Sequence, residues 1–308
     1  MATTKPKTAA KKTAAKPKTA AAKKTVKTVK PVATPVKTKK VVKEEEPKGI
    51  FKGFFAKKYE EDESILTIFK KPKFYGSLLG EVLGVAFITI AMFSLSLMGI
   101  ANIATYAFVF IAIILAVNAF SGAHLNPVVT VGMMATRRVS TIRGVVYIIA
   151  QIIGAWLGWI IFNGFHLAAG DTTTYTVPAM AKIAEGAFWP VTMIELFGAV
   201  IIAFFFARSL AYKRSVFTKS AMYVGGICLA VLAGYVVSAA YFGFQNNFVF
   251  NPAVALVYQI FPTSGEFGEI FGGICSALAT YAIIPMIGGV AGFYLADFAS
   301  KLSGEKDA

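Results

Sequence analysis

The chain contains 308 residues, of which 56% are hydrophobic, and its mean hydropathy is +0.64. A soluble domain cannot bury that much apolar surface, so the composition excludes an ordinary water-soluble globule and favours a protein that crosses a membrane several times. The formal net charge of +15 is concentrated near the N-terminus: residues 1–73 contain 21 Lys and 7 acidic residues, whereas residues 74–308 contain 10 basic and 9 acidic residues. The chain therefore has two physically different regions.

Residues 1–48 consist mainly of Lys, Ala, Thr, Pro and Val. A segment of this composition cannot form a packed core, so we expect a disordered cytoplasmic tail. Its positive charge fits two kinds of partner, namely anionic lipid at the membrane surface or nucleic acid bound through its phosphates. No aromatic residues lie between the lysines, so binding to nucleic acid would be purely electrostatic.

Residues 49–73 form a juxtamembrane segment of mixed character. Apolar residues recur at helical spacing at its start, and acidic residues and then lysines follow. This pattern predicts a short amphipathic helix that lies on the membrane surface.

Six apolar segments follow, each near the roughly 20 residues that a helix needs to cross a bilayer. They lie at about residues 75–98, 103–120, 143–165, 188–210, 219–242 and 269–296. The two cysteines, Cys228 and Cys275, lie within these segments, so we expect two buried free thiols rather than a disulfide framework. The membrane region then covers residues 74–298, and residues 299–308 form a short cytoplasmic C-terminus.

Basic residues are unevenly distributed among the connections between these segments. They precede the first segment and lie between the second and third and between the fourth and fifth, at Lys70, Lys71, Lys73, Arg137, Arg138, Arg143, Arg208, Lys213, Arg214 and Lys219. The other connections contain almost none. Because basic connections remain on the cytoplasmic side, this distribution predicts that both termini are cytoplasmic.

Two Asn-Pro motifs interrupt the apolar pattern. Residues 121–130 read Ser-Gly-Ala-His-Leu-Asn-Pro-Val-Val-Thr, and residues 250–254 read Phe-Asn-Pro-Ala-Val. Asn suits the N-cap of a helix and Pro suits its first position, so each motif predicts a helix start. The apolar run after each motif is too short to cross a membrane.

The same order of features occurs twice along the chain. Glu81 lies in the first apolar segment and Glu195 in the fourth, and each half contains one Asn-Pro motif. With three spans in each half, the second half is inverted, and the two motifs enter from opposite faces. Inverted repeats of this kind place their site at the membrane midplane, where broken helices meet.

The first motif resembles the signature of the major intrinsic protein family, the aquaporins and glycerol facilitators, and the second Asn-Pro-Ala repeats it. The resemblance covers about residues 75–297. It implies an all-α membrane protein: an aquaporin-like bundle of six transmembrane helices plus two re-entrant half-helices, built as an inverted repeat. It also implies a homotetramer, and the default location is the cell (plasma) membrane. The sequence contains no metal-ligand cluster, nucleophile triad or phosphate-binding loop, so we expect neither an enzyme nor a cofactor.

The resemblance places the pore midplane at the two Asn-Pro motifs, that is, at Asn126, Pro127, Val128, Asn251, Pro252 and Ala253. Two helix N-termini that meet there produce a positive potential, which repels cations. The two Asn amides would donate to a passing water or hydroxyl and orient it, which breaks a proton wire. Val128 replaces the usual Ala, and we expect slightly altered packing between the half-helices.

Four polar residues are expected to support the loops. Glu81 and Glu195 are charged groups inside apolar segments, which is costly unless they are paired; in the family the equivalent Glu accepts from backbone N–H groups of the re-entrant loops. The alternative is a carboxylate that reaches solvent near a span end. We expect His124 to brace its loop rather than to sense pH, and Gln151 to tie the loop to the bundle.

The resemblance also implies a selectivity constriction at Tyr106, Ala239, Phe248 and Val254, positions carried over by their spacing from the motifs. A two-residue shift would replace Tyr106 by Phe108. The family usually has Arg where this chain has Val254, and water-selective members have His where it has Ala239. The constriction should therefore be wider and more apolar than a strict water filter.

The signals for the solute conflict, because glycerol channels keep the Arg and usually follow it with Asp, where this chain has Ala255. Our main hypothesis is a channel for water and small uncharged solutes such as glycerol, with protons and cations excluded at the Asn-Pro motifs. One alternative is a channel for another small neutral solute with poor water flux. Another is a non-conducting membrane scaffold that works through its basic tail. Flux into liposomes would separate a channel from a scaffold.

Overall fold

The computed structural model describes residues 68–97, 102–170, 188–211, 215–242, 248–258 and 267–304. The tail and most of the juxtamembrane segment, residues 1–67, lie outside the described residues, and so do their predicted properties. The described part of the chain contains helices and no strand. In order, the helices are α2 (Pro72–Leu97), α3 (Ile103–Ser121), α4 (Pro127–Ala135), α5 (Thr141–Ala168), α6 (Phe188–Ala211), α7 (Val216–Phe242), α8 (Pro252–Tyr258), α9 (Phe267–Leu278), η1 (Ala279–Ile283) and α10 (Ile284–Leu302).

Six helical stretches of the described chain are long and apolar enough to cross a membrane, and they coincide with the six predicted segments. The sixth is a rod made of α9, η1 and α10, in which η1 is a short π-helical turn. Pro285 follows this turn, and its missing N–H removes one helical hydrogen bond there. The chain is a multi-pass membrane protein.

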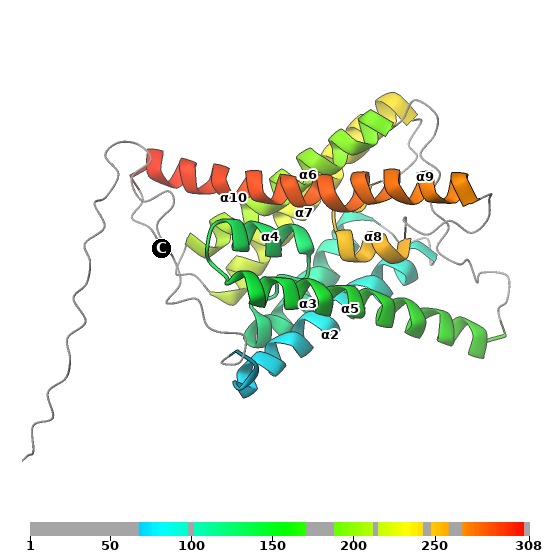
Figure 1. The fold of residues 1–308 in the computed structure, drawn as a ribbon, viewed down its shortest axis with the longest axis horizontal. Helices are drawn as coiled ribbons and strands as arrows, with labels where there is room; N and C mark the ends of the chain where they lie inside the picture. Colours follow the sequence, from blue (N-terminus) through cyan, green and yellow to red (C-terminus); the bar gives the residue numbers. More distant parts are fainter. Residues whose placement is uncertain are drawn as a thin grey trace, which may run out of the picture. The chain divides into compact units, whose positions relative to one another are not determined.

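The two halves of the chain pack in the same way. Helix α2 packs on α3 and α5 in the first half, and α6 packs on α7 and α10 in the second. The half-helices cross over: α4 of the first half contacts α10, whereas α8 of the second half contacts α5. In Figure 1 both half-helices lie between the α9–α10 rod and α5. The predicted inverted repeat with two short re-entrant helices is confirmed.

Matched pairs of glycines allow the long helices of each half to approach closely. A Cβ atom added at Gly154 or Gly158 of α5 would lie 2.4 or 2.5 Å from a backbone oxygen of α2. A Cβ atom at Gly288 or Gly292 of α10 would lie 2.6 or 2.4 Å from a backbone oxygen of α6. Small residues at such seams let helix backbones meet inside a membrane.

Large apolar side chains also cover the outward faces of the helices. Phe108 is 78% exposed and Val236 is 70% exposed. Cys275 is exposed as well, and Cys228 is half-buried, so the expectation of two buried thiols was wrong, although both thiols are free. Lipid is as apolar as a protein core, and hydropathy alone therefore does not separate a lipid-facing side chain from a buried one.

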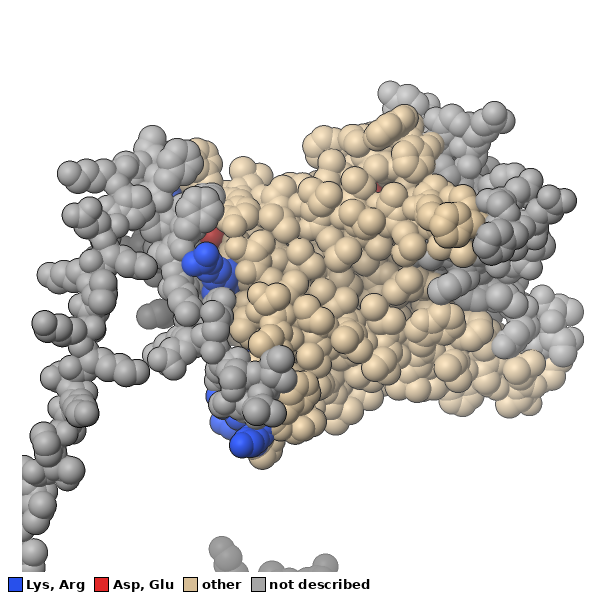
Figure 2. Space-filling view, viewed as in Figure 1, with Lys and Arg blue, Asp and Glu red and all other residues tan. Residues whose placement is uncertain are grey.

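Lys and Arg side chains of the described chain gather at one end of the visible face. Figure 2 shows Lys and Arg at that end beside a broad band without charge. The ends of helices that meet there carry Lys70, Lys71, Lys73, Arg137, Arg138, Arg143, Arg208, Lys219 and Lys301. We call this end the basic face.

Candidate pore

Each Asn-Pro motif starts a half-helix, as predicted. Asn126 is the N-cap of α4, and its side-chain oxygen accepts from the backbone N–H of Val128 at 2.9 Å. Helix α8 begins at Pro252, and the side-chain oxygen of Asn251 accepts from the N–H of Ala253 at 3.2 Å. Both prolines occupy the position at which their missing N–H has no cost.

The two Asn side chains also tie the two loops to each other. The Nδ2 atom of Asn126 donates to the carbonyl oxygen of Phe250 at 2.8 Å, and that of Asn251 donates to the carbonyl oxygen of Leu125 at 2.9 Å. Leu125 and Phe250 have φ angles of 52° and 57°, in the left-handed region that costs a non-glycine residue about 1–2 kcal/mol. Each strained residue therefore presents the carbonyl that the opposite Asn binds.

The buried glutamates hold these strained loops in place. Glu81 is fully buried and accepts from the backbone N–H groups of His124 at 3.0 Å and Leu125 at 2.8 Å. Glu195 is also fully buried and accepts from the N–H groups of Val249 and Phe250, the latter at 3.0 Å. Neither carboxylate reaches solvent. Backbone donors compensate the burial of each charge, and the same bonds fix the loop conformation.

A short chain of hydrogen bonds connects the first loop to α5. The Nε2 atom of Gln151 donates to Glu81 at 2.7 Å and to the hydroxyl of Thr130 at 2.9 Å. The ring nitrogen Nδ1 of His124 lies 3.2 Å from the same hydroxyl. His124 and Gln151 are both buried. This geometry suits the bracing functions proposed for them.

The two half-helices meet in one buried apolar cluster that includes Val128, Ala253 and Val254. Gly289 of α10 faces Val128: a Cβ atom there would lie 2.2 Å from the Val128 carbonyl oxygen and 3.0 Å from its Cγ1 atom. The absence of a side chain at Gly289 therefore makes room first for the backbone carbonyl at position 128 and also for the Cγ1 atom of the valine.

A cavity of about 280 Å³ lies next to the paired asparagines, and both Asn126 and Asn251 line it. A water molecule occupies about 30 Å³ of liquid, so the cavity is large enough for several waters. Its walls are mostly apolar and aromatic, and they come from α2, α3, α6, α7 and the two loops before the half-helices. The aromatic members are Tyr106, Phe110, Tyr223, Tyr235, Phe248 and Phe250.

The structure separates the four residues that were assigned to the selectivity constriction. Tyr106 and Phe248 line the cavity, whereas Phe108, the alternative to Tyr106, points outward. Val254 is fully buried and is not among the cavity-lining residues. Ala239 belongs to α7, but its side chain lies outside the described residues.

Tyr235 is a cavity residue that the sequence analysis did not identify. It lies on α7 four residues before Ala239, and its ring meets Phe248 edge to face, with centroids 5.5 Å apart. The family spacing, counted back from Asn251, selects Ala239 and not Tyr235. The helical period of α7 would have found it, because Val224, Ile227, Val231 and Tyr235 recur every three or four residues and all line the cavity.

A metal site is not evident in the part of the chain that the structure describes. No three His, Cys, Asp or Glu side chains are grouped closely enough to hold an ion there.

The family model for the major intrinsic proteins matches residues 69–296. The chain belongs to this family, and the resemblance inferred from the Asn-Pro motifs is confirmed. Glycerol uptake facilitator protein-like 6 of Lactiplantibacillus plantarum is 27% identical over 244 residues, which cover 76% of this chain and 97% of that protein. Aquaporin-5 of Sus scrofa is 26% identical over 180 residues, or 55% of this chain and 63% of the relative.

Aquaporin C of Dictyostelium discoideum is 29% identical over 186 residues, which cover 56% of this chain and 62% of the relative. The chain thus spans less than two thirds of these two aquaporins. Among solved structures, the aquaglyceroporin from Plasmodium falciparum superposes with a TM-score of 0.51 at 15% identity, covering 74% of this chain and 96% of that one. This likeness confirms the predicted aquaporin-like fold.

Proposed function

We propose that this protein is a passive transmembrane channel, not an enzyme, for water and small uncharged solutes such as glycerol. The observation that carries the proposal is the pair Asn126 and Asn251. Each caps a half-helix, each donates to the opposite loop, and both line the same cavity. Nothing in this arrangement makes or breaks a bond in the solute.

The amide geometry explains how such a site would exclude protons. An Asn amide nitrogen has two N–H groups, and in each residue one of them binds the opposite carbonyl. The second N–H of each amide is available to a solute in the cavity. A water that accepts from both amides directs its own hydrogens away from the midplane, so a continuous proton wire is interrupted. The positive N-terminal ends of α4 and α8 repel cations at the same point.

The residues that line the cavity suit a solute that is partly apolar. Tyr106, Tyr235 and Phe248 offer rings to a carbon backbone, while the Asn amides offer donors to hydroxyl oxygens. The name of the bacterial relative, a glycerol uptake facilitator-like protein, agrees with this chemistry. We further propose a homotetramer in the plasma membrane, with both termini and the basic face in the cytoplasm and with the tail on anionic lipid.

Asn251→Asp tests the midplane. Aspartate keeps the capping oxygen but loses both N–H groups and adds a negative charge, so α8 should still form. We expect wild-type proteoliposomes to pass water and glycerol faster than protein-free liposomes in stopped-flow light scattering. The glycerol flux of the variant should be at least tenfold lower than that of the wild type. The variant should also leak protons, which an entrapped pH dye measures.

Other outcomes select among the alternatives. Glycerol flux with poor water flux would favour a channel for neutral solutes other than water. No flux of either, from folded wild-type protein, would contradict the proposal and favour the scaffold.

A further inference from the structure

The cavity beside the asparagines ends at Tyr223 of α7. Tyr223, Leu125 and Asn126 line it, whereas the next side chains toward the basic face, those of Phe206 and His124, do not. All of these side chains are nearly inaccessible to solvent. A pore that continues from the midplane toward the basic face therefore has to pass Tyr223.

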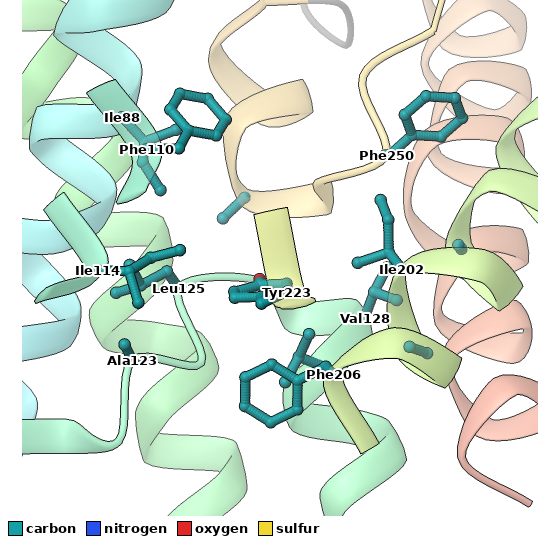
Figure 3. Close-up of a cluster of buried hydrophobic side chains, with 14 of the residues drawn as sticks. Ile88, Phe110, Ile114, Ala123, Leu125, Val128, Ile202, Phe206, Tyr223 and Phe250 are labelled. Atoms are coloured by element: carbon teal, nitrogen blue, oxygen red, sulfur yellow. The ribbon is translucent and has the colours of Figure 1, made fainter. Parts of the chain in front are cut away.

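Tyr223 lies across the space between the two halves of the chain. Figure 3 shows its ring between Leu125 and Ile114 on one side and Ile202 and Val128 on the other. Its hydroxyl donates to the carbonyl oxygen of His124 at 2.9 Å. The ring thus lies at the end of the cavity, and a hydrogen bond anchors it there.

Phe206 of α6 forms a second aromatic layer behind Tyr223. The two rings meet edge to face, with centroids 4.8 Å apart and planes at 84°, and Figure 3 shows Phe206 directly below Tyr223. The rings of His124 and Phe293 lie 5.9 and 6.1 Å from that of Phe206. Aromatic rings that pack edge to face stabilise one another beyond the area they bury.

The hydrogen bond of Tyr223 occupies an acceptor that a permeating solute would need. Glu81 binds the N–H groups of His124 and Leu125 and so holds this stretch of loop extended beside the cavity. Of the two carbonyl oxygens there, that of Leu125 binds Asn251 and that of His124 binds Tyr223. A solute that binds the His124 carbonyl on its way from the midplane toward the basic face competes with the Tyr223 hydroxyl for that oxygen.

We propose that Tyr223, backed by Phe206, forms a second constriction that determines which solutes pass and at what rate. The proposal rests on the proposed channel function. A solute with its own O–H replaces the Tyr223 hydroxyl on His124 without leaving a buried acceptor unpaired, whereas a solute without a donor leaves it unpaired. The constriction therefore favours water and polyols over neutral solutes of similar size without a donor.

Tyr223→Phe removes the competing hydroxyl and keeps the ring. We expect glycerol flux into proteoliposomes to rise about fivefold, because the His124 carbonyl becomes available to the solute. The double variant Tyr223→Ala with Phe206→Ala should raise flux further and pass a neutral solute without a donor. Tyr294→Phe is the matched control, because Tyr294 also donates to a backbone carbonyl, that of Ala135, at 2.9 Å but does not line the cavity. Wild-type flux and solute preference in both Tyr223 variants would overturn the proposal.

A labelling experiment separates this proposal from the channel function itself. Cys228 lines the cavity, and replacing Cys275 by Ser leaves it as the one thiol of the chain. A membrane-impermeant, sulfonate-bearing methanethiosulfonate should modify Cys228 only from the face opposite the basic face in the parent protein. In the double variant it should modify Cys228 from both faces.

An unfolding temperature in detergent close to that of the parent protein shows that each variant is folded, because an unfolded chain would expose Cys228 to the reagent from either face. Labelling of the double variant from the basic face without flux of any solute would support the constriction and contradict the channel function. If Cys228 stays protected from the basic face in the double variant, Tyr223 and Phe206 do not form the barrier.

Discussion

The amide of Asn126 acts in two directions: its oxygen caps α4, and its nitrogen binds the loop of the other half. Asn251 does the same for α8. Shortening either side chain would therefore uncap a helix and separate the two loops at once. This double use explains why Asn is required: Asp would supply the cap but not the donors, and Ser would not reach the opposite carbonyl.

Tyr235 carries the residue-scale prediction. Its ring narrows the cavity beside Phe248, so Tyr235→Ala should admit larger polyols and raise the flux of a five-carbon polyol relative to glycerol at least tenfold. Val236→Ala is the matched control, because Val236 is the next residue but is 70% exposed on the outer face. Stopped-flow measurements with both polyols check the ratio. An unchanged ratio in the Tyr235 variant would contradict a place for Tyr235 in the constriction and would favour the original assignment of that position to Ala239.

At the scale of helices, the two seams between α2 and α5 and between α6 and α10 define how closely the bundle packs. Each seam places glycines against backbone oxygens on the helix that carries the buried glutamate. The seams therefore fix the helices from which Glu81 and Glu195 reach the loops. A shift of one helix by an ångström would lengthen the hydrogen bonds that hold Leu125 and Phe250 in their left-handed conformations.

Gly158→Ala tests this dependence. The added Cβ would lie 2.5 Å from the carbonyl oxygen of Ala86, and backbone cannot move aside cheaply. We expect the protein to lose about 1–3 kcal/mol of stability, seen as a lower unfolding temperature in detergent, together with lower flux. Gly164→Ala on the same helix has nothing within 4 Å and should be neutral or slightly stabilising, because Ala favours helix more than Gly. Equal effects of the two substitutions would contradict the seam.

At the scale of the whole molecule, the chain divides into two units, residues 1–46 and residues 47–308. The membrane unit contains the half-helices, the buried glutamates and the cavity. The first unit contains none of these residues, but it contributes a large share of the net positive charge. Conduction by the membrane unit and binding of the first unit to an anionic membrane surface should therefore be separable.

Deletion of residues 1–46 should leave water and glycerol flux within twofold of the full chain. It should also remove salt-sensitive attachment of protein-loaded nanodiscs to anionic vesicles, because each Lys near such a surface contributes about 1 kcal/mol. Vesicle co-flotation at low and high salt measures the attachment. Retention of duplex DNA by the full chain, without binding to vesicles, would instead favour the nucleic-acid alternative for the tail.

The sequence by itself was sufficient to predict the six spans, the helix starts at Asn126 and Asn251 and the need for a partner at Glu81 and Glu195, whereas the loops as that partner came from the resemblance to the family. Each of these depends on a local property: the length of an apolar run, the capping preference of Asn and Pro, or the cost of a charge in lipid. The inverted repeat followed because the same signals occur twice in one order.

Only the tertiary structure decided which side chains face the cavity and which face lipid. Tyr235, Val254 and Cys275 all lie in apolar segments, and hydropathy treats them alike, because lipid and protein core are equally apolar. The layer of Tyr223 and Phe206 joins rings from α7 and α6 with a loop carbonyl almost 100 residues earlier. Such a contact depends on how whole helices pack, and no local pattern of residues specifies it.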